Sequence, residues 1–401
     1  ALPILTEFKD FRWGMHFKII AKKLFKRFFN LPGVPEIYYW VIVHLNKELL
    51  YDCCWWHLPK WLDDLKDIDS KNNISFNGKV LVFSTLPYWN NYMVSLSVVL
   101  LGRGINVDFV WIIYPKILVN NYILGYKHWE RMFYKKRSKI NNAKCNFINL
   151  NDIKTTLIND EMKEAAYQQA LIDVSYLLKK EKIDIDLSLI DKKTFELRYK
   201  QNLKAISSIA ALIKQNKYER MIIPNGVSLD FGAVYKYLNN QGVAISSIEM
   251  WDLSGKVVVS NDTPVVQINT ENLWIKDAPH VLTEDKKLRV QKIIETRQRP
   301  ASKDLTIIYQ RGNFETSDSV YALLKLQKEK PVVLVCPNVP FDSIFYVERK
   351  KNFNSMREWL IETVKYLEYR DDCQVIIRSH PAEEHHEASE TTESLMNEVF
   401  T

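Results

Sequence analysis

Short apolar runs, each followed by a polar turn and a helical pattern, constrain the fold of this chain more than any other feature. Residues 79–83 predict a buried strand, 84–90 a loop, and 95–101 a helix that leads to a second strand at 105–113. A strand, a helix and a further strand in this order predict a βαβ unit with parallel strands. The loop then lies at the carboxyl edge of the sheet, where α/β proteins bind ligands.

The same pattern returns further along the chain. Residues 220–224 predict a strand, Asn225 and Gly226 a tight left-handed turn, 232–238 a helix and 243–249 another strand. The turn, at the end of a strand, either contacts a ligand or is an ordinary turn. Both interpretations stay open.

The pattern of strand, loop, helix and strand occurs a third time near the end of the chain. Residues 331–336 predict a strand, 337–342 a loop, 355–369 an amphipathic helix and 374–378 another strand. Two parallel strands need cover on both faces and partners at both edges. We therefore expect further chain after Thr401, which would complete this domain.

With 401 residues the chain is long enough for two ordinary domains. We expect an α/β fold with two Rossmann-like domains and parallel sheets. Residues 1–76 are predicted to form a basic, aromatic-rich helical segment. Residues 77–285 form the first domain, with a helical insertion at about 151–217, and 300–401 form an incomplete second domain.

Positive charge gathers at the start of the sequence. The formal net charge is +7, and residues 1–30 hold seven Lys and Arg against two acidic residues, a net +5. Apolar side chains recur there at helical spacing, with lysines between them. Such a helix suits a membrane surface that carries anionic lipids, or equally a cationic helix packed on its own domain.

Other sequence features exclude several classes of protein. No apolar run reaches the roughly 20 residues that span a bilayer, and no signal peptide is recognisable. The five cysteines form no C-x-x-C pair, which fits a reducing compartment. Charges nearly balance outside the first helix and no nucleic-acid-reading motif is present, so no nucleic-acid partner is expected. The sequence predicts a cytoplasmic protein, free or attached peripherally to the inner face of the membrane.

The densest polar cluster follows the last predicted strand. Arg378 and His380 can pair with phosphate through charge-assisted hydrogen bonds. Pro381 fixes the turn, and Glu383 can accept hydrogen bonds from ribose or sugar hydroxyls. A histidine at a strand end can also merely cap a helix, and that alternative stays open.

Three carboxylates are candidates for a general base, which must reach the proton of an acceptor hydroxyl. They are Glu249, Asp230 and Asp342, each near an expected crevice. Each can instead be a solvated or helix-capping acid. Tyr88 and Trp89, in the 84–90 loop, offer an apolar platform for a sugar ring or a base, or else pack in the core.

Longer motifs carry a resemblance to a known family. The second domain contains, in order, P-N-V-x-x-D at 337–342, S-x-x-E-W-L-x-E-T at 355–363, I-R-x-H-P-A-E at 377–383 and T-x-E-S at 391–394. With the turn at 224–226, this order resembles the capsule polysaccharide biosynthesis glycosyltransferases. The resemblance runs from about residue 79 to the C-terminus and does not cover the first 76 residues.

The resemblance implies a GT-B fold. A nucleotide-sugar donor is then held mainly by the second domain, through residues that include Asn338 and Ser355. The acceptor is held mainly by the first domain, through Asn225 and Gly226 among others.

We therefore expect a metal-independent bacterial glycosyltransferase, with no cofactor beyond its nucleotide-sugar substrate. Its acceptor is predicted to be a lipid-linked or oligosaccharide chain of capsule or another surface polysaccharide. Asp184 and Asp186 imitate a D-x-D metal motif, but no buried strand precedes them. Two alternatives remain: a CDP-polyol phosphotransferase of the teichoic-acid type, which shares the His-Pro pair, and a non-catalytic scaffold of a polysaccharide assembly complex.

Overall fold

The fold was established from a computed structural model. It describes residues 78–119, 121–122, 130, 145–250, 257–278, 280–298, 316–342, 352–385 and 388–400. The predicted N-terminal helical segment and the basic helix within it lie outside the described residues. Among the described helices, none is both long and apolar enough to cross a bilayer.

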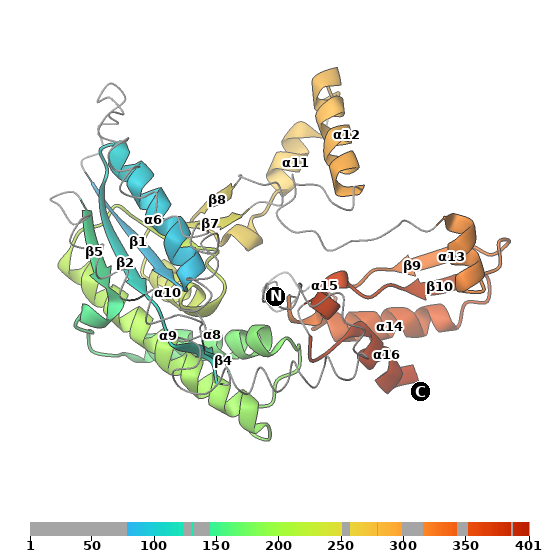
Figure 1. Ribbon diagram of the computed structural model, residues 1–401, viewed down its shortest axis with the longest axis horizontal. Coiled ribbons are helices and arrows are strands. Elements are labelled where there is room, and N and C mark those ends of the chain that lie inside the picture. Colours follow the sequence, from blue (N-terminus) through green and yellow to red (C-terminus); the bar gives the residue numbers. More distant parts are fainter. Residues whose placement is uncertain are drawn as a thin grey trace, which may run out of the picture. The chain divides into compact units, whose positions relative to one another are not determined.

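A mixed six-stranded sheet forms the main α/β part of the protein (Figure 1). Its order is β5 (Cys145–Asn149), β2 (Asn106–Ile112), β1 (Lys79–Thr85), β6 (Arg220–Pro224), β7 (Ile245–Met250) and β8 (Val257–Asn261). β1, β6 and β7 run parallel, and β8 pairs antiparallel with β7. β1 and β2 are buried along nearly their whole length, as their continuous apolar runs predict.

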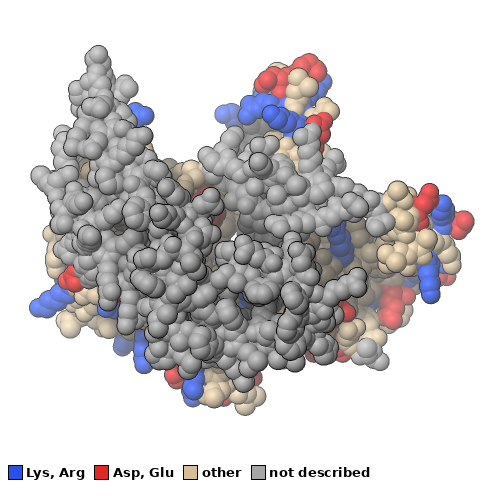
Figure 2. Space-filling view, in the orientation of Figure 1, with Lys and Arg blue, Asp and Glu red and all other residues tan. Residues whose placement is uncertain are grey.

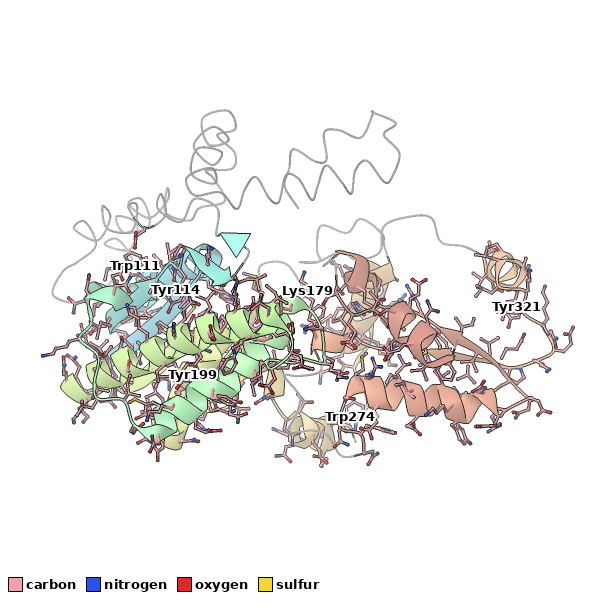
Figure 3. All side chains as sticks on the ribbon, turned by 90° about the horizontal axis from the view of Figure 1, so that it is seen from below. Trp111, Tyr114, Lys179, Tyr199, Trp274 and Tyr321 are labelled. Atoms are coloured by element: carbon pink, nitrogen blue, oxygen red, sulfur yellow. The ribbon has the colours of Figure 1, made fainter. Side chains whose placement is uncertain are left out.

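Three helices from the second half of this region pack on one another. They are α8 (Asp160–Leu178), α9 (Leu189–Gln215) and α10 (Leu229–Asn240). The side chain of Asn159 caps α8 and that of Ser188 caps α9. α8 and α9 lie side by side, with Lys179 at the end of α8 and Tyr199 on α9 (Figure 3). Both helices lie within residues 151–217, where the sequence predicts helical structure.

The predicted loop at 84–90 is wrong. β1 continues to Thr85, and helix α6 (Pro87–Gly102) begins two residues later. Pro87 stands in the first turn of α6, where a missing N–H costs nothing. Sequence reasoning took this proline for a loop residue, whereas it starts the helix. It also missed β5, β8 and the short strands β3 (Lys116–Leu118) and β4 (Asn121–Tyr122).

A second parallel pair follows in the C-terminal part. β9 (Val332–Val335) pairs with β10 (Gln374–Ile377), and Val335 lies opposite Ile377. Helix α14 (Met356–Glu368) and helix α16 (Thr392–Phe400) cover this pair through a small core around Leu360 and Leu395. This strand–helix–strand unit confirms the elements predicted at 331–378. The short helices α13 (Ser317–Leu323) and α15 (Pro381–His385) complete the described part.

Two helices link the regions along the sequence, α11 (Glu271–Asp277) and α12 (Glu284–Gln298). Both basic and acidic side chains are visible on the surface of α12 (Figure 2). By packing, residues 85–147 belong to one compact unit, and residues 77–84 with 148–401 belong to another. The domain boundaries expected from the sequence remain a prediction.

Gly232 offers a test of the packing between α10 and α8. An added Cβ there would stand 2.3 Å from Oε1 of Gln169 and 2.6 Å from the carbonyl oxygen of Val227. Because both neighbours are buried, we expect Gly232→Ala to lower the free energy of unfolding by about 1–3 kcal/mol. Gly242→Ala is the control, since its Cβ would meet nothing within 4 Å and only its φ of +73° is unfavourable. Urea denaturation of both variants should show the larger loss for Gly232→Ala, and an equal or smaller loss would contradict this packing.

Candidate functional site

The carboxyl ends of β6 and β7 bring two of the predicted site residues together; we call this place the β6–β7 edge. Pro224 on β6 is paired with Ile248 on β7. The next residues, Asn225 and Glu249, therefore lie beside each other on these two parallel strands. The N–H of Asn225 donates to the carbonyl of Ile248 at 2.9 Å. The Asn225 side chain also lies close enough to the Glu249 carboxylate to lower its pKa. Both side chains are half-buried and so reach the surface in part.

Burial is the dominant influence on the Glu249 carboxyl and raises its pKa above the ordinary value. A hydrogen bond from the N–H of Met250 and the nearby Asn225 side chain act in the opposite direction. A carboxylate with a raised pKa is a stronger base than a solvated one. Glu249 therefore has the location and the basicity that a general base for a hydroxyl needs.

The loop from β6 to α10 uses its own backbone N–H groups internally. Those of Val227 and Ser228 both donate to Oδ1 of Asn225, at 3.1 and 3.2 Å. The N–H of Gly226 donates to Pro224, and that of Leu229 donates to Asp173 at 2.7 Å. A phosphate cradle needs backbone N–H groups that point outward. This loop offers a ligand side chains instead, which suits hydroxyl groups better than phosphate.

Gly226 shapes the loop and makes no surface for a ligand. Its φ of +82° confirms the predicted left-handed turn. The residue is buried, and an added Cβ would touch Pro264 and the ring of Tyr235 at 3.4 Å. Of the two residues expected to contact an acceptor here, the structure leaves Asn225 near the surface and places Gly226 beneath it.

Asp230 does not stand in a crevice. Its side chain is fully buried, 3.4 Å from the guanidinium of Arg198, which also pairs with Asp173 at 3.0 Å. Burial raises the pKa of Asp230, and the nearby Asp173 carboxylate raises it further, while Arg198 acts against both. A base for a substrate hydroxyl must be reachable, so the earlier hypothesis for Asp230 is corrected: it belongs to a buried ionic network.

The carboxyl ends of β9 and β10, which we call the β9–β10 edge, bring Asp342 and His380 together. Burial raises the pKa of Asp342, and the charge of His380 lowers it, so the two groups interact electrostatically. Nδ1 of His380 accepts the N–H of Ala382 at 3.1 Å. A neutral ring in this arrangement carries its proton on Nε2 and can donate it to an anion. His380 thus does cap the start of α15, as the alternative interpretation held.

Three further predicted donor residues line up with this edge. Arg378 is exposed at the end of β10, and it has no ion pair with the described residues. Asn338 is exposed in the loop after β9, where its Oδ1 accepts the N–H of Val339 at 2.9 Å. Pro381 begins α15 directly after His380. Their positions are compatible with a bound anion beside His380.

Glu383 and Ser355 serve the protein's own helices, so their predicted contacts with a donor are not supported. The buried Glu383 carboxylate accepts the N–H of Thr392 at 2.9 Å and its hydroxyl at 2.6 Å, which caps α16. Ser355 caps α14 by accepting the N–H of Glu358 at 2.9 Å. The carboxylate of Glu181 accepts the next free N–H groups of α14, from Met356 and Arg357, at 2.8 and 2.9 Å.

Tyr88 and Trp89 stand in the first turn of α6, not in a loop. Trp89 is half-buried and meets the ring of Tyr92 edge-on, with ring centroids 6.1 Å apart. The Tyr88 side chain lies outside the described residues. Oδ1 of Asp184 accepts the N–H groups of Asp186 and Leu187 and so forms a turn before α9. Among the described residues no group of His, Cys, Asp or Glu has the arrangement of a metal site.

Sequence reasoning missed the residues that support the β6–β7 edge from beneath. These are Gln169 and Asp173 on α8, with Arg198 and Asn202 on α9. In each helix the two polar residues are four apart, so they share a face. The one sequence signal for such a network is a pair of polar residues four apart on the helix face that is otherwise expected to be apolar.

Comparison of the chain with protein-family models, with curated proteins and with solved structures gives no match. The family membership expected from the motifs therefore remains a prediction that rests on the residues quoted above.

The buried network makes a prediction about pH. The folded-state pKa of Asp230 is raised, so its contribution is fully present below the unfolded pKa of about 3.9 and is lost as pH rises through the folded pKa. Asp230→Asn removes the titrating carboxyl, and with it the loss of stability that its ionisation causes. Across a urea titration series from about pH 4 to 8, we expect the stability of wild type relative to D230N to fall as pH rises.

Asp191→Asn is the matched control. Asp191 is equally buried, and burial alone would raise its pKa, but hydrogen bonds from Asp184 N–H and Lys180 prevail and lower it. Its stabilising contribution is present above the unfolded pKa and is lost as pH falls through the folded pKa. Most of the Asp191 change falls below about pH 4, so across the series the stability of wild type relative to D191N should stay level or rise slightly, whereas relative to D230N it falls. A common slope would contradict the assignment of the Asp230 pKa.

Proposed function

We propose that this protein is a GT-B glycosyltransferase that moves a sugar from a nucleotide-sugar donor to a growing bacterial surface polysaccharide. The observation that carries the proposal is the Asn225–Glu249 pair: a half-buried carboxylate with a raised pKa beside an amide, at the carboxyl edge of parallel strands. Ligands of open α/β sheets bind at such edges. The motif order from 337 to 394 supplies the donor class, and the acceptor class comes from the same resemblance.

In the proposed reaction an acceptor hydroxyl binds at the β6–β7 edge. Glu249 takes the hydroxyl proton while the oxygen attacks the anomeric carbon of the donor sugar. The bond from that carbon to the phosphate oxygen breaks, and the nucleotide leaves with the bonding electron pair. Asn225 orients the carboxylate and can hydrogen-bond a second sugar hydroxyl.

The β9–β10 edge is the proposed donor site. The His380 ring contacts a phosphate oxygen of the donor, and the exposed guanidinium of Arg378 adds a positive charge that stabilises the leaving group. Asp342, whose pKa is raised by burial, can accept a hydrogen bond from the donor or stay protonated beside it. We place the enzyme at the inner face of the cytoplasmic membrane, where lipid-linked acceptors are made.

The donor site is tested by calorimetric titration of the full chain with CMP, CDP, UDP and GDP. We expect one nucleotide to bind and His380→Ala to weaken it at least tenfold, the loss of one charge-assisted hydrogen bond. His280→Ala is the matched control, because His280 is exposed in the segment between α11 and α12. Absence of binding by every nucleotide would favour the scaffold alternative, and a phosphopolyol in the product mass would favour the phosphotransferase.

The base is tested by Glu249→Gln, which keeps the shape of the side chain and removes its basicity. We expect kcat for transfer to fall by about 10²–10⁴-fold, the contribution typical of a positioned general base. The Kd of the nucleotide should stay within twofold of wild type, because Glu249 lies at the acceptor edge. A variant that transfers sugar at the wild-type rate would show that Glu249 is not the base.

A further inference from the structure

Asp173 joins the loop after β6 to the helix α9. Its Oδ1 faces the loop and accepts from the N–H of Leu229 at 2.7 Å and from the Gln169 amide at 2.9 Å. Its Oδ2 faces α9 and accepts from Arg198 at 3.0 Å and from Asn202 at 2.9 Å. Each oxygen therefore has two donors, and the side chain is fully buried. No sequence motif marked this residue.

The same network holds the loop at a second point. The Gln169 amide also donates to the carbonyl of Val227 at 3.0 Å. Val227 and Leu229 are thus both tied to α8, and Ser228 between them has a fixed position. Leu229 itself has a φ of +52°, a left-handed conformation that a leucine adopts only when its surroundings impose it.

The fixed loop in turn sets the Asn225 side chain. Oδ1 of Asn225 accepts both the N–H and the hydroxyl of Ser228, each at 3.2 Å. Nδ2 of Asn225 donates to Oγ of Ser228 at 3.1 Å, so the loop holds both ends of the amide, which lies beside the Glu249 carboxylate and lowers its pKa. Hydrogen bonds and one peptide link therefore connect Asp173, through Leu229 and Ser228, to the Asn225 side chain, which lies beside Glu249.

We propose that Asp173 is a positioning residue for the acceptor site, which holds residues 227–229 from α8 and thereby keeps the Asn225 amide against Glu249. Asp173 is buried and touches no substrate, so it acts through the loop alone. The inference rests on the proposed function only in taking Glu249 as the base.

Asp173→Asn tests the proposal, because one of its two acceptor positions becomes an N–H₂ donor. If the new N–H₂ group faces the loop, it meets the N–H of Leu229, and the hydrogen bond to Leu229 is lost. If it faces Arg198, the N–H of Leu229 keeps an acceptor, but a neutral amide oxygen, which is weaker than a carboxylate oxygen. As the Asn225 amide lowers the Glu249 pKa, its displacement should move the titration midpoint of Glu249 upward by about half to one pH unit. The midpoint is measured by NMR on the full chain with ¹³C-labelled glutamate carboxyls, and Glu249→Gln identifies the signal.

Gln169→Leu provides a second variant that keeps the Asp173–Arg198 ion pair. It removes the bonds to Val227 and to Oδ1 of Asp173, and we expect a smaller upward shift of the same midpoint. Asp191→Asn is the control, since it removes another buried carboxylate, paired with Lys180 at 2.7 Å, that makes no contact with the loop. It should lower stability and leave the Glu249 midpoint at its wild-type value.

The outcomes separate cleanly. An upward shift in D173N or Q169L, with none in D191N, supports the proposal. An unchanged midpoint in a folded D173N overturns it, and if D173N fails to fold, an unchanged midpoint in Q169L does so. The titration needs no substrate, so a failure to detect sugar transfer bears on the proposed function and leaves this result standing.

Discussion

The buried ion pair between Asp173 and Arg198 is the interaction on which the candidate site depends. Taking two charges out of water costs several kcal/mol per ion, so such a pair persists only when further hydrogen bonds satisfy both groups. Here Gln169, Asn202 and the N–H of Leu229 do so. The last of these offsets the roughly 1–2 kcal/mol that a leucine loses in a left-handed conformation. The shape of the loop after β6 is therefore fixed by helices distant in sequence.

Much of the sheet could be predicted from sequence because its strands are buried on both faces. Apolar runs at β1, β2 and β6 leave few other interpretations, and the predicted strands coincide with these elements. The strands predicted at β7, β9 and β10 coincide as well, although β7 contains two serines and β9 and β10 are only partly buried. β8 was missed because it is a largely exposed strand of five residues at the edge of the sheet, and β5 because its apolar run is too short to distinguish. An edge strand needs only its neighbour's hydrogen bonds, and these leave little trace in composition.

The site residues were harder to predict because capping a helix and binding a ligand use the same chemistry. A carboxylate or a hydroxyl at the end of a strand can accept N–H groups from either. Glu383 and Ser355 stand in the quoted motifs, yet their acceptors are filled by α16 and α14. Sequence order cannot say which donor lies nearest. The network around Asp173 was missed for the related reason that its partners on α9 and in the loop after β6 are 25 to 56 residues away.

Two carboxylates of the first region show how burial assigns different roles to similar groups. Asp230 and Glu249 both have a raised pKa, and desolvation is the main cause in each. Asp230 is enclosed beside Arg198, so its charge can only serve the fold. Glu249 is half-buried and lies beside one amide, so it has basicity together with access. The loop beside Glu249 uses its backbone N–H groups internally, whereas the β9–β10 edge holds the His380 ring and the exposed guanidinium of Arg378. Hydroxyl chemistry thus fits the first edge, and phosphate fits the second.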